Sequence, residues 1–257
     1  MFARTNLADF GLGGGTGAFA CRFRLAHDAG AVRGLVALSA NGTLLPALPD
    51  ADAPTAARAL TTASVAALIG PQGPVRALES ALRLAGVARL RDDDDDPFTL
   101  DLDALTVPEG PGALQPMSAV ASALLLDGLT AYEIETLNTP AALAPARAAQ
   151  ALRDARDQDT GVVLVERGTP LAVTRFNAQP PGIVQVGGVY TPPTRRGRHD
   201  ARRVVALHLA QARRQDVRQA VLFSANDAAS RAYRALGFRR IGKWSLILLR
   251  APQRIGN

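Results

Sequence analysis

The chain has 257 residues, of which 47% are hydrophobic and 20% charged, a balance that supports a substantial core and excludes wholesale disorder. Its single cysteine, Cys21, excludes an internal disulfide, and its three histidines lack zinc-site spacing, so we expect a reducing compartment and no metal. The net charge of +6 admits a nucleic acid partner, but aromatic residues make up only 5%, which argues against the stacking surfaces of single-strand binders.

The N-terminal stretch MFARTNLADFGLGGG has no apolar h-region, and no stretch approaches twenty apolar residues. The sequence therefore predicts a cytoplasmic protein with no secretory signal and no membrane partner. It does not predict an oligomeric state.

The first hundred residues predict a small sheet with two helices. Asn41-Gly42 is a strong hairpin signal between two apolar runs. The expected elements are strands at 18–26, 31–39 and 44–48, a helix at 53–62, a strand at 65–69, a helix at 74–84 and a strand at 98–102.

Two polar stretches interrupt this pattern. Arg91–Pro97 (RDDDDDP) repels itself and offers no defined cation cage, so we expect a solvated loop there. Residues 108–116 (PEGPGALQP) break both helical and strand periodicity and read as a linker. The predicted organisation is a first domain at 1–107, the linker at 108–116 and a second domain at 117–257.

The second domain predicts helices, a hairpin and a strand–helix–strand–helix–strand unit. Ser118 is a candidate N-cap for its first helix, and Arg167-Gly168 is the hairpin turn. The expected elements are helices at 118–133 and 139–157, strands at 161–166, 170–176 and 183–190, a helix from 201, a strand at 220–223, a helix at 227–236 and a strand at 240–249.

An Arg-rich loop at 194–200 joins strand 183–190 to the following helix. The first N–H groups of a helix are unpaired and its dipole favours anions there, while arginine binds phosphate bidentately and glycine permits close approach. Arg195, Arg196, Gly197 and Arg198 therefore predict a phosphate cradle. The segment from Arg195 to the end contains fourteen arginines and one lysine but only three aspartates, so the chain's positive charge is concentrated around and after this loop.

The segment 183–244 resembles the acetyl-CoA-binding half of the GNAT superfamily of N-acetyltransferases. The superfamily cradle Q/R-x-x-G-x-G/A corresponds to Arg196–Ala201, and the preceding VYTPP matches a family flank. The second flank, N-x-x-x-S-x-x-Y-x-x-x-G-F, is formed by Asn226, Ser230, Tyr233, Gly237 and Phe238. His199 stands where the family has glycine: either its imidazole points into solvent and is tolerated, or it weakens CoA affinity.

The resemblance implies a mixed α/β (α+β) tandem GNAT-like fold, with two mixed central sheets flanked by helices. The first half has Pro49-Asp50-Ala51-Asp52 where a cradle would lie, and two carboxylates repel phosphate. We therefore interpret the first half as a degenerate GNAT-like domain without cofactor. An unrelated α/β domain is the alternative.

The implied function is an acyl-CoA-dependent N-acyltransferase that moves an acetyl group from acetyl-CoA directly to a primary amine. In the family, the strand before the cradle bulges and its backbone holds the pantetheine arm and the thioester oxygen, a role that falls here to 188–191, with Val189 assigned as catalytic. Tyr233 is the implied proton donor to the leaving sulfur, unless it merely packs on Phe238. The residues assigned to acetyl-CoA are Gly188, Val189, Tyr190, Thr191, Arg195, Arg196, Gly197, Arg198, His199, Asp200, Ala201, Asn226, Ser230 and Tyr233.

The general base and the acceptor stay open. Glu133 and Glu135 are candidate bases, and a water relay is the alternative. The basic C-terminal half hints at an acidic or carboxylated acceptor, but a metabolite amine, an antibiotic, a peptide N-terminus and a protein lysine all remain candidates. A non-catalytic acyl-CoA sensor or interaction module is the alternative function.

Overall fold

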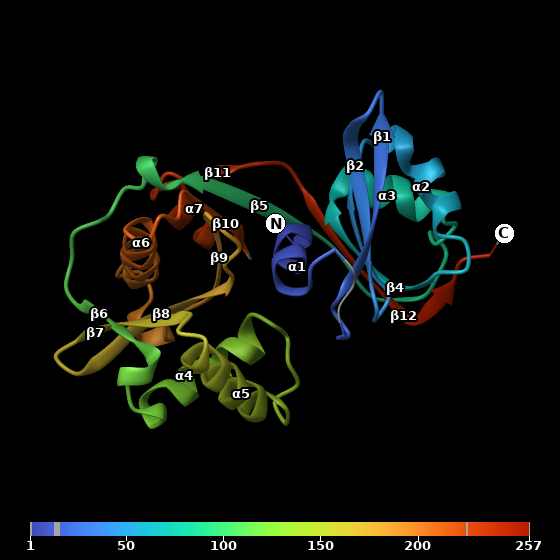
Figure 1. The fold of residues 1–257 in the computed structure, drawn as a ribbon. Coiled ribbons are helices and arrows are strands. Elements are labelled where there is room, and N and C mark those ends of the chain that lie inside the picture. The colour runs from blue at the N-terminus through green and yellow to red at the C-terminus, as the bar shows by residue number, and fades with distance from the viewer. Residues whose placement is uncertain (1, 13–15, 225, 257) are drawn as a thin grey trace. The chain divides into compact units, whose positions relative to one another are not determined.

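The chain folds into two compact units in a computed structural model that describes residues 2–12, 16–224 and 226–256 (Figure 1). Unit 1 comprises Met1–Pro97 and Ile241–Asn257, and unit 2 comprises Phe98–Arg240. The predicted boundaries at 107 and 117 therefore fall inside unit 2. Met1, the glycines at 13–15, Ala225 and Asn257 lie outside the described residues.

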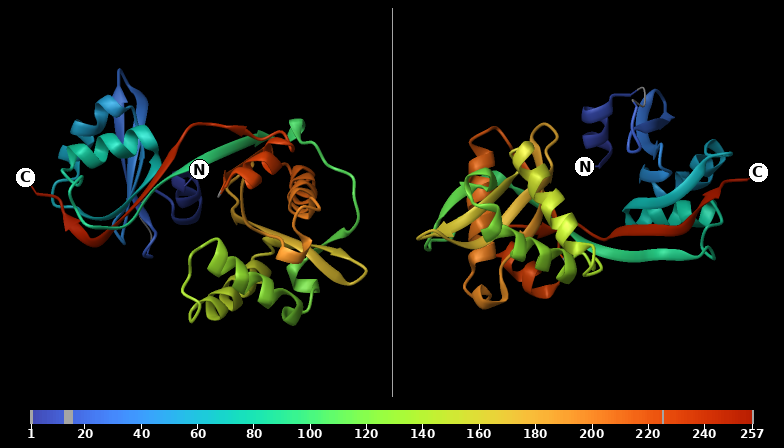
Figure 2. Two further views of the ribbon diagram at one scale, coloured as in Figure 1. Left: turned by 180° about the vertical axis from the view of Figure 1, so that it is seen from behind. Right: turned by 90° about the horizontal axis from the view of Figure 1, so that it is seen from below.

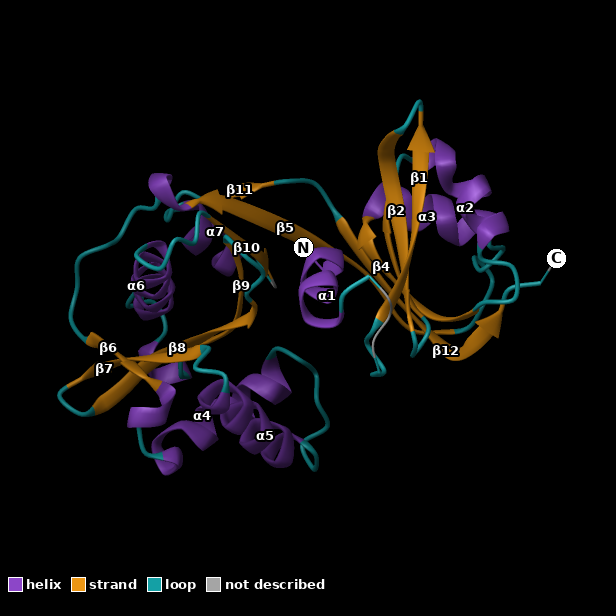
Figure 3. Cartoon of the chain, viewed as in Figure 1, coloured by secondary structure: helices purple, strands orange, loops and turns teal. Residues whose placement is uncertain are grey.

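Unit 1 is a mixed sheet with two helices packed against it (Figure 3). The sheet order is β1-β2-β3-β4-β12-β5, and only β3 and β4 run parallel. The predicted order of three strands, helix, strand, helix, strand is confirmed, and a short N-terminal helix that was not predicted precedes it. The elements are α1 (Phe2–Phe10), β1 (Cys21–Asp28), β2 (Ala31–Ser39), β3 (Thr43–Ala47), α2 (Ala53–Ala59), β4 (Ser64–Pro71), α3 (Gln72–Ala81), β5 (Arg89–Asp101) and β12 (Trp244–Arg254).

The aspartate run predicted as a solvated loop is instead part of strand β5. Its residues pair antiparallel with β12, with Asp92 opposite Ile247. Basic side chains offset the negative charge: Arg76 of α3 lies 2.7 Å from Asp92 and 3.0 Å from Asp94, and Arg89 also binds Asp92. The loop prediction was wrong because it counted charges along the chain and not those brought in from neighbouring elements.

The last strand was predicted to belong to the second half, but it lies in unit 1. β12 lies between β4 and β5, pairing Leu246 with Ile69 on one side and with Asp93 on the other. Figure 2 shows this red C-terminal strand running beside the green β5 in both views. Ile247 and Leu249 of β12 are buried in the core of unit 1, so the C-terminal segment completes that core.

Unit 2 is a second mixed sheet. Its order is β5-β10-β9-β8-β7-β6, with the short β11 also pairing β5; β9 and β10 run parallel. The predicted hairpin and the strand–helix–strand–helix order are confirmed. Apart from the end of β5, the elements are β6 (Ala113–Pro116), α4 (Ser122–Glu135), α5 (Ala144–Asp157), β7 (Gly161–Glu166), β8 (Thr169–Ala178), β9 (Ile183–Tyr190), α6 (Asp200–Arg213), β10 (Gln219–Ser224), α7 (Asp227–Arg234) and β11 (Arg239–Arg240).

Helices cover both faces of the unit 2 sheet. Alternate residues of β7 point to opposite faces, as strand geometry requires. Val162 and Leu164 pack in a core with α6, whereas Val163 and Val165 pack in a core with α4 and α5. In Figure 1, α6 accordingly lies on one side of β7 and β8, and α4 and α5 lie on the other. The predicted fold class, mixed sheets flanked by helices, is confirmed.

Two local predictions in unit 2 were wrong. The end of the expected linker forms β6, which pairs with β7, so 108–116 lies within the unit. α4 begins at Ser122, and Ser118 lies in a short 3-10 turn. The reason is Arg156 of α5, whose guanidinium donates to the carbonyl oxygens of Met117 (3.0 Å) and Val120 (2.6 Å) and holds this turn apart from the helix.

Helices long and apolar enough to cross a membrane do not occur in the described part of the chain.

Candidate functional site

The parallel strands β9 and β10 are paired at one end only. Their register joins 183–185 to 219–221, and no pairing follows between the later described residues of the two strands. A parallel ladder normally continues along both strands. The sheet is therefore open beside the C-terminal half of β9, where an extended ligand could pair with a strand edge.

A bulge re-aims β9 beside this opening. Gly188 and Val189 together face the single residue Thr174 of β8. Gly188 has φ +56°, and a Cβ there would lie 2.8 Å from Cγ of Arg175. Only glycine fits this left-handed conformation and close approach without strain. The bulge that the resemblance implied is present.

The cradle loop reaches the N-terminus of α6 through two left-handed residues. Gly197 has φ +79° and nothing within 4 Å of a Cβ built on it. His199, the N-cap of α6, has φ +67° and makes no side-chain cap hydrogen bond. Its side chain is exposed, so the imidazole points into solvent. A glycine at this position would adopt the same conformation without strain.

Two of the three cradle arginines already have carboxylate partners. The Nε of Arg195 donates to the buried Asp200 carboxylate at 3.1 Å. Arg196 donates to Glu135 at 2.5 Å and lies over the Tyr190 ring. Among the described residues, Arg198 has no ion pair with a carboxylate, so it is the arginine most available to a phosphate.

Thr191 and Arg202 carry buried polar atoms beside the cradle. The hydroxyl of Thr191 follows β9 directly, and Arg202 lies in the first turn of α6. The Thr191 Oγ1 and the Arg202 Nε have no hydrogen-bond partner among the residues that the structure describes. Buried polar groups are normally satisfied, so these two atoms indicate a site for a polar ligand.

The Asn226 and Ser230 side chains have structural roles at the start of α7. Asn226 is its N-cap, with the side-chain oxygen accepting from the Ala229 N–H at 2.9 Å. The buried Ser230 hydroxyl donates to the Ser224 hydroxyl at 2.8 Å. Of the two roles expected for Asn226, the one at the helix start is observed.

Tyr233, on α7, is buried. Its ring packs edge-on against Phe238, with centroids 5.9 Å apart. Burial raises the pKa of the Tyr233 phenol well above its usual value of 10, and the nearby Tyr132 raises it further. Tyr233 therefore holds its proton at neutral pH. The packing of Tyr233 on Phe238 that was the alternative interpretation is observed.

Tyr132 links the bulge to the other two tyrosines of the chain. The rings of Tyr132 and Tyr190 are edge-on, with centroids 6.2 Å apart, and Tyr132 acts electrostatically on Tyr233. Burial raises the pKa of Tyr132, while the Arg175 charge and the Gly188 amide lower it in part. Tyr132 of α4 thus lies between the bulge and α7.

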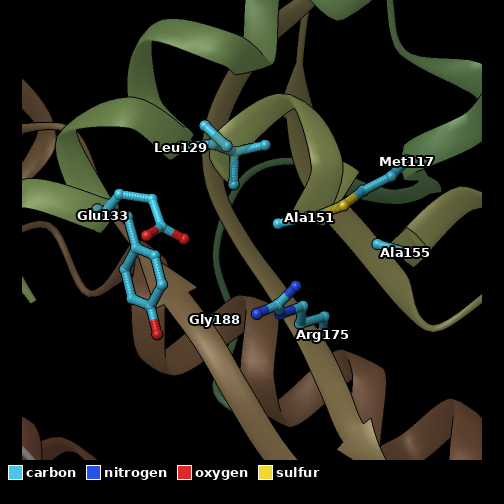
Figure 4. A pocket seen from close by; sticks show the side chains of 9 residues that line it. Met117, Leu129, Glu133, Ala151, Ala155, Arg175 and Gly188 are labelled. Atoms are coloured by element: carbon cyan, nitrogen blue, oxygen red, sulfur yellow. The ribbon is translucent and has the colours of Figure 1, made fainter. Parts of the chain in front are cut away.

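A pocket opens beside Gly188 on the α4 side of the sheet. It is narrow: its cavity volume of about 10 Å³ is enough for about one water molecule. Glu133 from α4 and Arg175 from β8 point into the same space (Figure 4). The lining residues are Met117, Leu129, Tyr132, Glu133, Ala148, Ala151, Ala155, Arg175 and Gly188.

The two candidate bases differ in position. Glu133 is 5% exposed and lines the pocket, where its Oε2 accepts from the Thr139 hydroxyl at 2.7 Å. Glu135 lies outside the pocket. It binds Arg196, whose hydrogen bond and charge lower the pKa of Glu135, and it accepts a hydrogen bond from the Tyr190 hydroxyl. Of the two, Glu133 is the carboxylate that lines the pocket.

The sequence did not indicate Tyr132, Arg175 or Thr174. Tyr132 and Arg175 lie on elements far from the cradle in sequence and meet it only in the folded unit. The scarcity of tyrosine, three residues in 257, was the one signal available for Tyr132.

Residues 129–238 match the model of the family described as the acetyltransferase (GNAT) family. No curated protein matches the chain in sequence.

Solved structures match nearly the whole chain. A GCN5-related N-acetyltransferase from Kribbella flavida has a TM-score of 0.55 at 20% identity, over 89% of this chain and 90% of that one. A GNAT-family acetyltransferase from Colwellia psychrerythraea has a TM-score of 0.53 at 12% identity, over 90% and 86%. A Drosophila protein has a TM-score of 0.60 at 11% identity, over 90% and 80%. At these identities the similarity concerns the fold.

Proposed function

We propose that this chain, whose residues 129–238 match the model of the acetyltransferase (GNAT) family, is an acyl-CoA-dependent N-acyltransferase. In this proposal it moves an acetyl group from acetyl-CoA directly to a primary amine. The observation that carries the proposal is the opening between β9 and β10, which leads to the uncapped N-terminus of α6. The cytoplasmic location expected from the sequence stays a prediction.

The residues around the opening fit the chemistry of CoA. The unpartnered Thr191 hydroxyl offers a hydrogen bond to a pantetheine amide or a phosphate. Gly197 leaves open space for a pyrophosphate at the helix N-terminus, where backbone N–H groups and the dipole favour anions. Arg198 adds a positive charge at the same place. Acetyl-CoA, when bound, supplies the acyl group as a thioester.

The bulge gives the backbone its part in the reaction. A strand without a bulge directs its N–H groups into the neighbouring strand, whereas Gly188 and Val189 depart from that register. A backbone N–H at Val189 would stabilise negative charge on the thioester oxygen as the amine attacks. Removing one such donor in other enzymes costs about 10²–10³ in rate.

Tyr233 is proposed to return a proton to the departing sulfur. Because burial raises the pKa of its phenol, Tyr233 stays protonated at neutral pH and has a proton to donate. Tyr132 is close enough to influence Tyr233 and is the second phenol available.

Calorimetric titration with acetyl-CoA tests the proposal. One site per chain is expected, and no binding at millimolar CoA would refute it. An acceptor screen read by thiol release then tests turnover. Tyr233→Phe should lower thiol release without changing affinity for acetyl-CoA.

A non-catalytic acyl-CoA sensor is the second candidate function. It is favoured by His199 at the glycine position of the cradle and by the packing of Tyr233 against Phe238. The sensor would bind acetyl-CoA without releasing thiol from any amine, and Tyr233→Phe would change nothing.

Unit 1 is proposed to bind no acyl-CoA. Its parallel strands β3 and β4 correspond in order to β9 and β10, but they stay close together: a Cβ on Gly70 of β4 would lie 3.0 Å from the Pro46 carbonyl oxygen of β3. Asp50 and Asp52 occupy the turn into α2. A stoichiometry of two acetyl-CoA molecules per chain would contradict this proposal.

A further inference from the structure

A wide polar groove lies on the α6 face of the unit 2 sheet. It is lined by residues of β6 and β7, by the C-terminal half of α6, and by the chain around the ends of α5 and β8. Its cavity volume is about 540 Å³, which falls in the range of small-molecule sites. Polar atoms make up most of its surface. The groove therefore has both the room and the chemistry for a polar ligand.

This groove is separate from the cradle proposed for acetyl-CoA. The cradle precedes the N-terminus of α6, whereas the groove lies beside the C-terminal half of the same helix. His208 and Gln211, which line the groove, lie about 12 and 16 Å further along the helix axis than Asp200. The groove is therefore a second site on unit 2.

The wall of the groove contains a buried histidine without a hydrogen-bond partner. His208 is 5% exposed, and its ring stacks on Phe176 with centroids 3.7 Å apart. Its Nδ1 is fully buried and has no partner among the described residues. Its Nε2 makes no hydrogen bond with them either but is not fully covered, so it is the nitrogen that a ligand in the groove can meet. Buried polar groups normally have partners, so His208 indicates that a polar ligand occupies this groove.

Four glutamines complete the polar lining. Their side chains are exposed and make no hydrogen bond with the part of the chain that the structure describes. Each amide both donates and accepts hydrogen bonds, and a neutral imidazole has one N–H and one lone pair. A hydroxyl group also donates and accepts, so it matches every one of these side chains. The glutamines are Gln115, Gln179, Gln211 and Gln215.

The two charged residues of the groove do not favour an ion. Arg156 uses its Nε and both Nη atoms to hold the carbonyl oxygens of Met117 and Val120 and the hydroxyl of Ser122. Asp159 is exposed and makes no ion pair with a described residue. The two formal charges cancel, so neither an anion nor a cation gains a net attraction to the groove.

The groove also lacks a platform for a flat base. Phe176 and His208 supply the aromatic rings of its lining, and these two rings stack on each other. Both side chains are buried, so neither presents an open ring face. Proteins that hold nucleobases stack them on aromatic side chains, which favours a hydroxylated ligand here over a base.

We propose that the groove binds a small neutral polyol, a monosaccharide or a cyclitol, through His208 Nε2 and the glutamine amides. Adjacent hydroxyl groups on one ring satisfy several of these side chains at once, because each hydroxyl donates to one group and accepts from another. Leu114 supplies apolar surface for the C–H groups of the ring. This site goes beyond the proposed acyl transfer and does not require CoA.

Nitrogen NMR of the full chain tests the proposal. Uniformly ¹⁵N-labelled protein is titrated with myo-inositol and with D-glucose, and separately with inorganic phosphate and with adenosine. We expect both polyols to shift the ring-nitrogen signals of His208, because a hydrogen bond forms at Nε2. The signals of His27 and His199, which are exposed and lie outside the groove, should not move with the polyols. Phosphate and adenosine should leave His208 unchanged.

Two variants assign the contacts. His208→Phe keeps a ring against Phe176 and removes both nitrogens, and Gln211→Met keeps the length of the side chain and removes the amide. Polyol binding is then read from the backbone amide signals of β6 and β7. Each variant should weaken it about 2- to 10-fold, the effect of losing one neutral hydrogen bond. The control Gln158→Met changes an exposed glutamine outside the groove and should bind polyol as the wild type does.

The outcomes separate this site from the acyltransferase function. The proposal is overturned if neither polyol moves His208 at high millimolar concentration, if only phosphate or adenosine moves it, or if the variants bind like the control. It is also overturned if saturating acetyl-CoA displaces the polyol, since that would place the polyol in the cradle. Simultaneous binding of both supports two sites, and polyol binding without any acetyl-CoA binding would refute the acyltransferase function alone.

Discussion

Gly197 offers a test of the phosphate cradle that separates folding from binding. Gly197→Ala adds one methyl group at a backbone position with φ +79° and open space around it. Alanine adopts this left-handed conformation at a cost of about 1 kcal/mol. For a chain of this size, such a loss lowers the melting temperature by about 2–4 °C.

The effect on acetyl-CoA affinity should be larger. If the pyrophosphate approaches the backbone at Gly197, the methyl group holds it away from the N–H donors at the start of α6. A hydrogen bond to a charged group contributes about 1.5–3 kcal/mol, so losing one weakens binding at least about tenfold.

Gly168→Ala is the matched control. Gly168 has φ +78° and nothing within 4 Å of its built Cβ, but it lies in the β7–β8 hairpin turn. The assays are thermal melting and calorimetric titration with acetyl-CoA. Both variants should lose similar stability, and only Gly197→Ala should lose affinity. Equal acetyl-CoA affinity in the two variants would refute a pyrophosphate site at this loop.

Three further predictions concern stability. His199→Gly removes the strain of a non-glycine residue at φ +67°. It should raise the free energy of unfolding by up to about 1 kcal/mol, and with it the melting temperature, without loss of acetyl-CoA affinity. A lower melting temperature would contradict the strain. Arg76 lowers the pKa of Asp92, so Arg76→Gln should destabilise the protein at pH 7, and its difference from wild type in urea melts should shrink as the pH falls below about 4, where the wild type also loses this pair. Burial lowers the pKa of His208 to about 3. The wild-type free energy of unfolding should therefore fall by about 1.4 kcal/mol per pH unit below about 6.5, where only the unfolded chain binds the proton, and His208→Phe should remove that slope.

Local patterns in the sequence were sufficient for most elements of unit 2. The hairpin at Arg167-Gly168 and the strand–helix–strand–helix order follow from residues that are close in the chain: turn residues that accept positive φ, and apolar periods of two or 3.6. The cradle is likewise one continuous segment. Its glycine, arginines and helix start could be recognised together because they are neighbours in the chain.

The tertiary structure decided which strands pair and which charges meet. The sequence alone predicts a loop for the aspartate run. In the folded chain Arg76 of α3 offsets its charge, and β12, about 150 residues later, pairs with its backbone. The sequence predicts Arg195 and Arg196 as phosphate ligands. In the structure Arg195 donates to Asp200, and Arg196 donates to Glu135.

The pocket beside Gly188 depends on tertiary structure most of all. Glu133, Arg175 and Gly188 come from α4, β8 and β9, and nothing in the spacing of these residues along the chain sets their distance in space. Their arrangement is fixed by the β8–β9 register, with its bulge, and by the packing of α4 on one face of the sheet. The sequence by itself thus determined the fold class and the position of the proposed cradle, because both follow from patterns and motifs of residues close together in the chain. Only the folded chain brought the opposite charges of the pocket together, because that requires long-range strand register and helix packing.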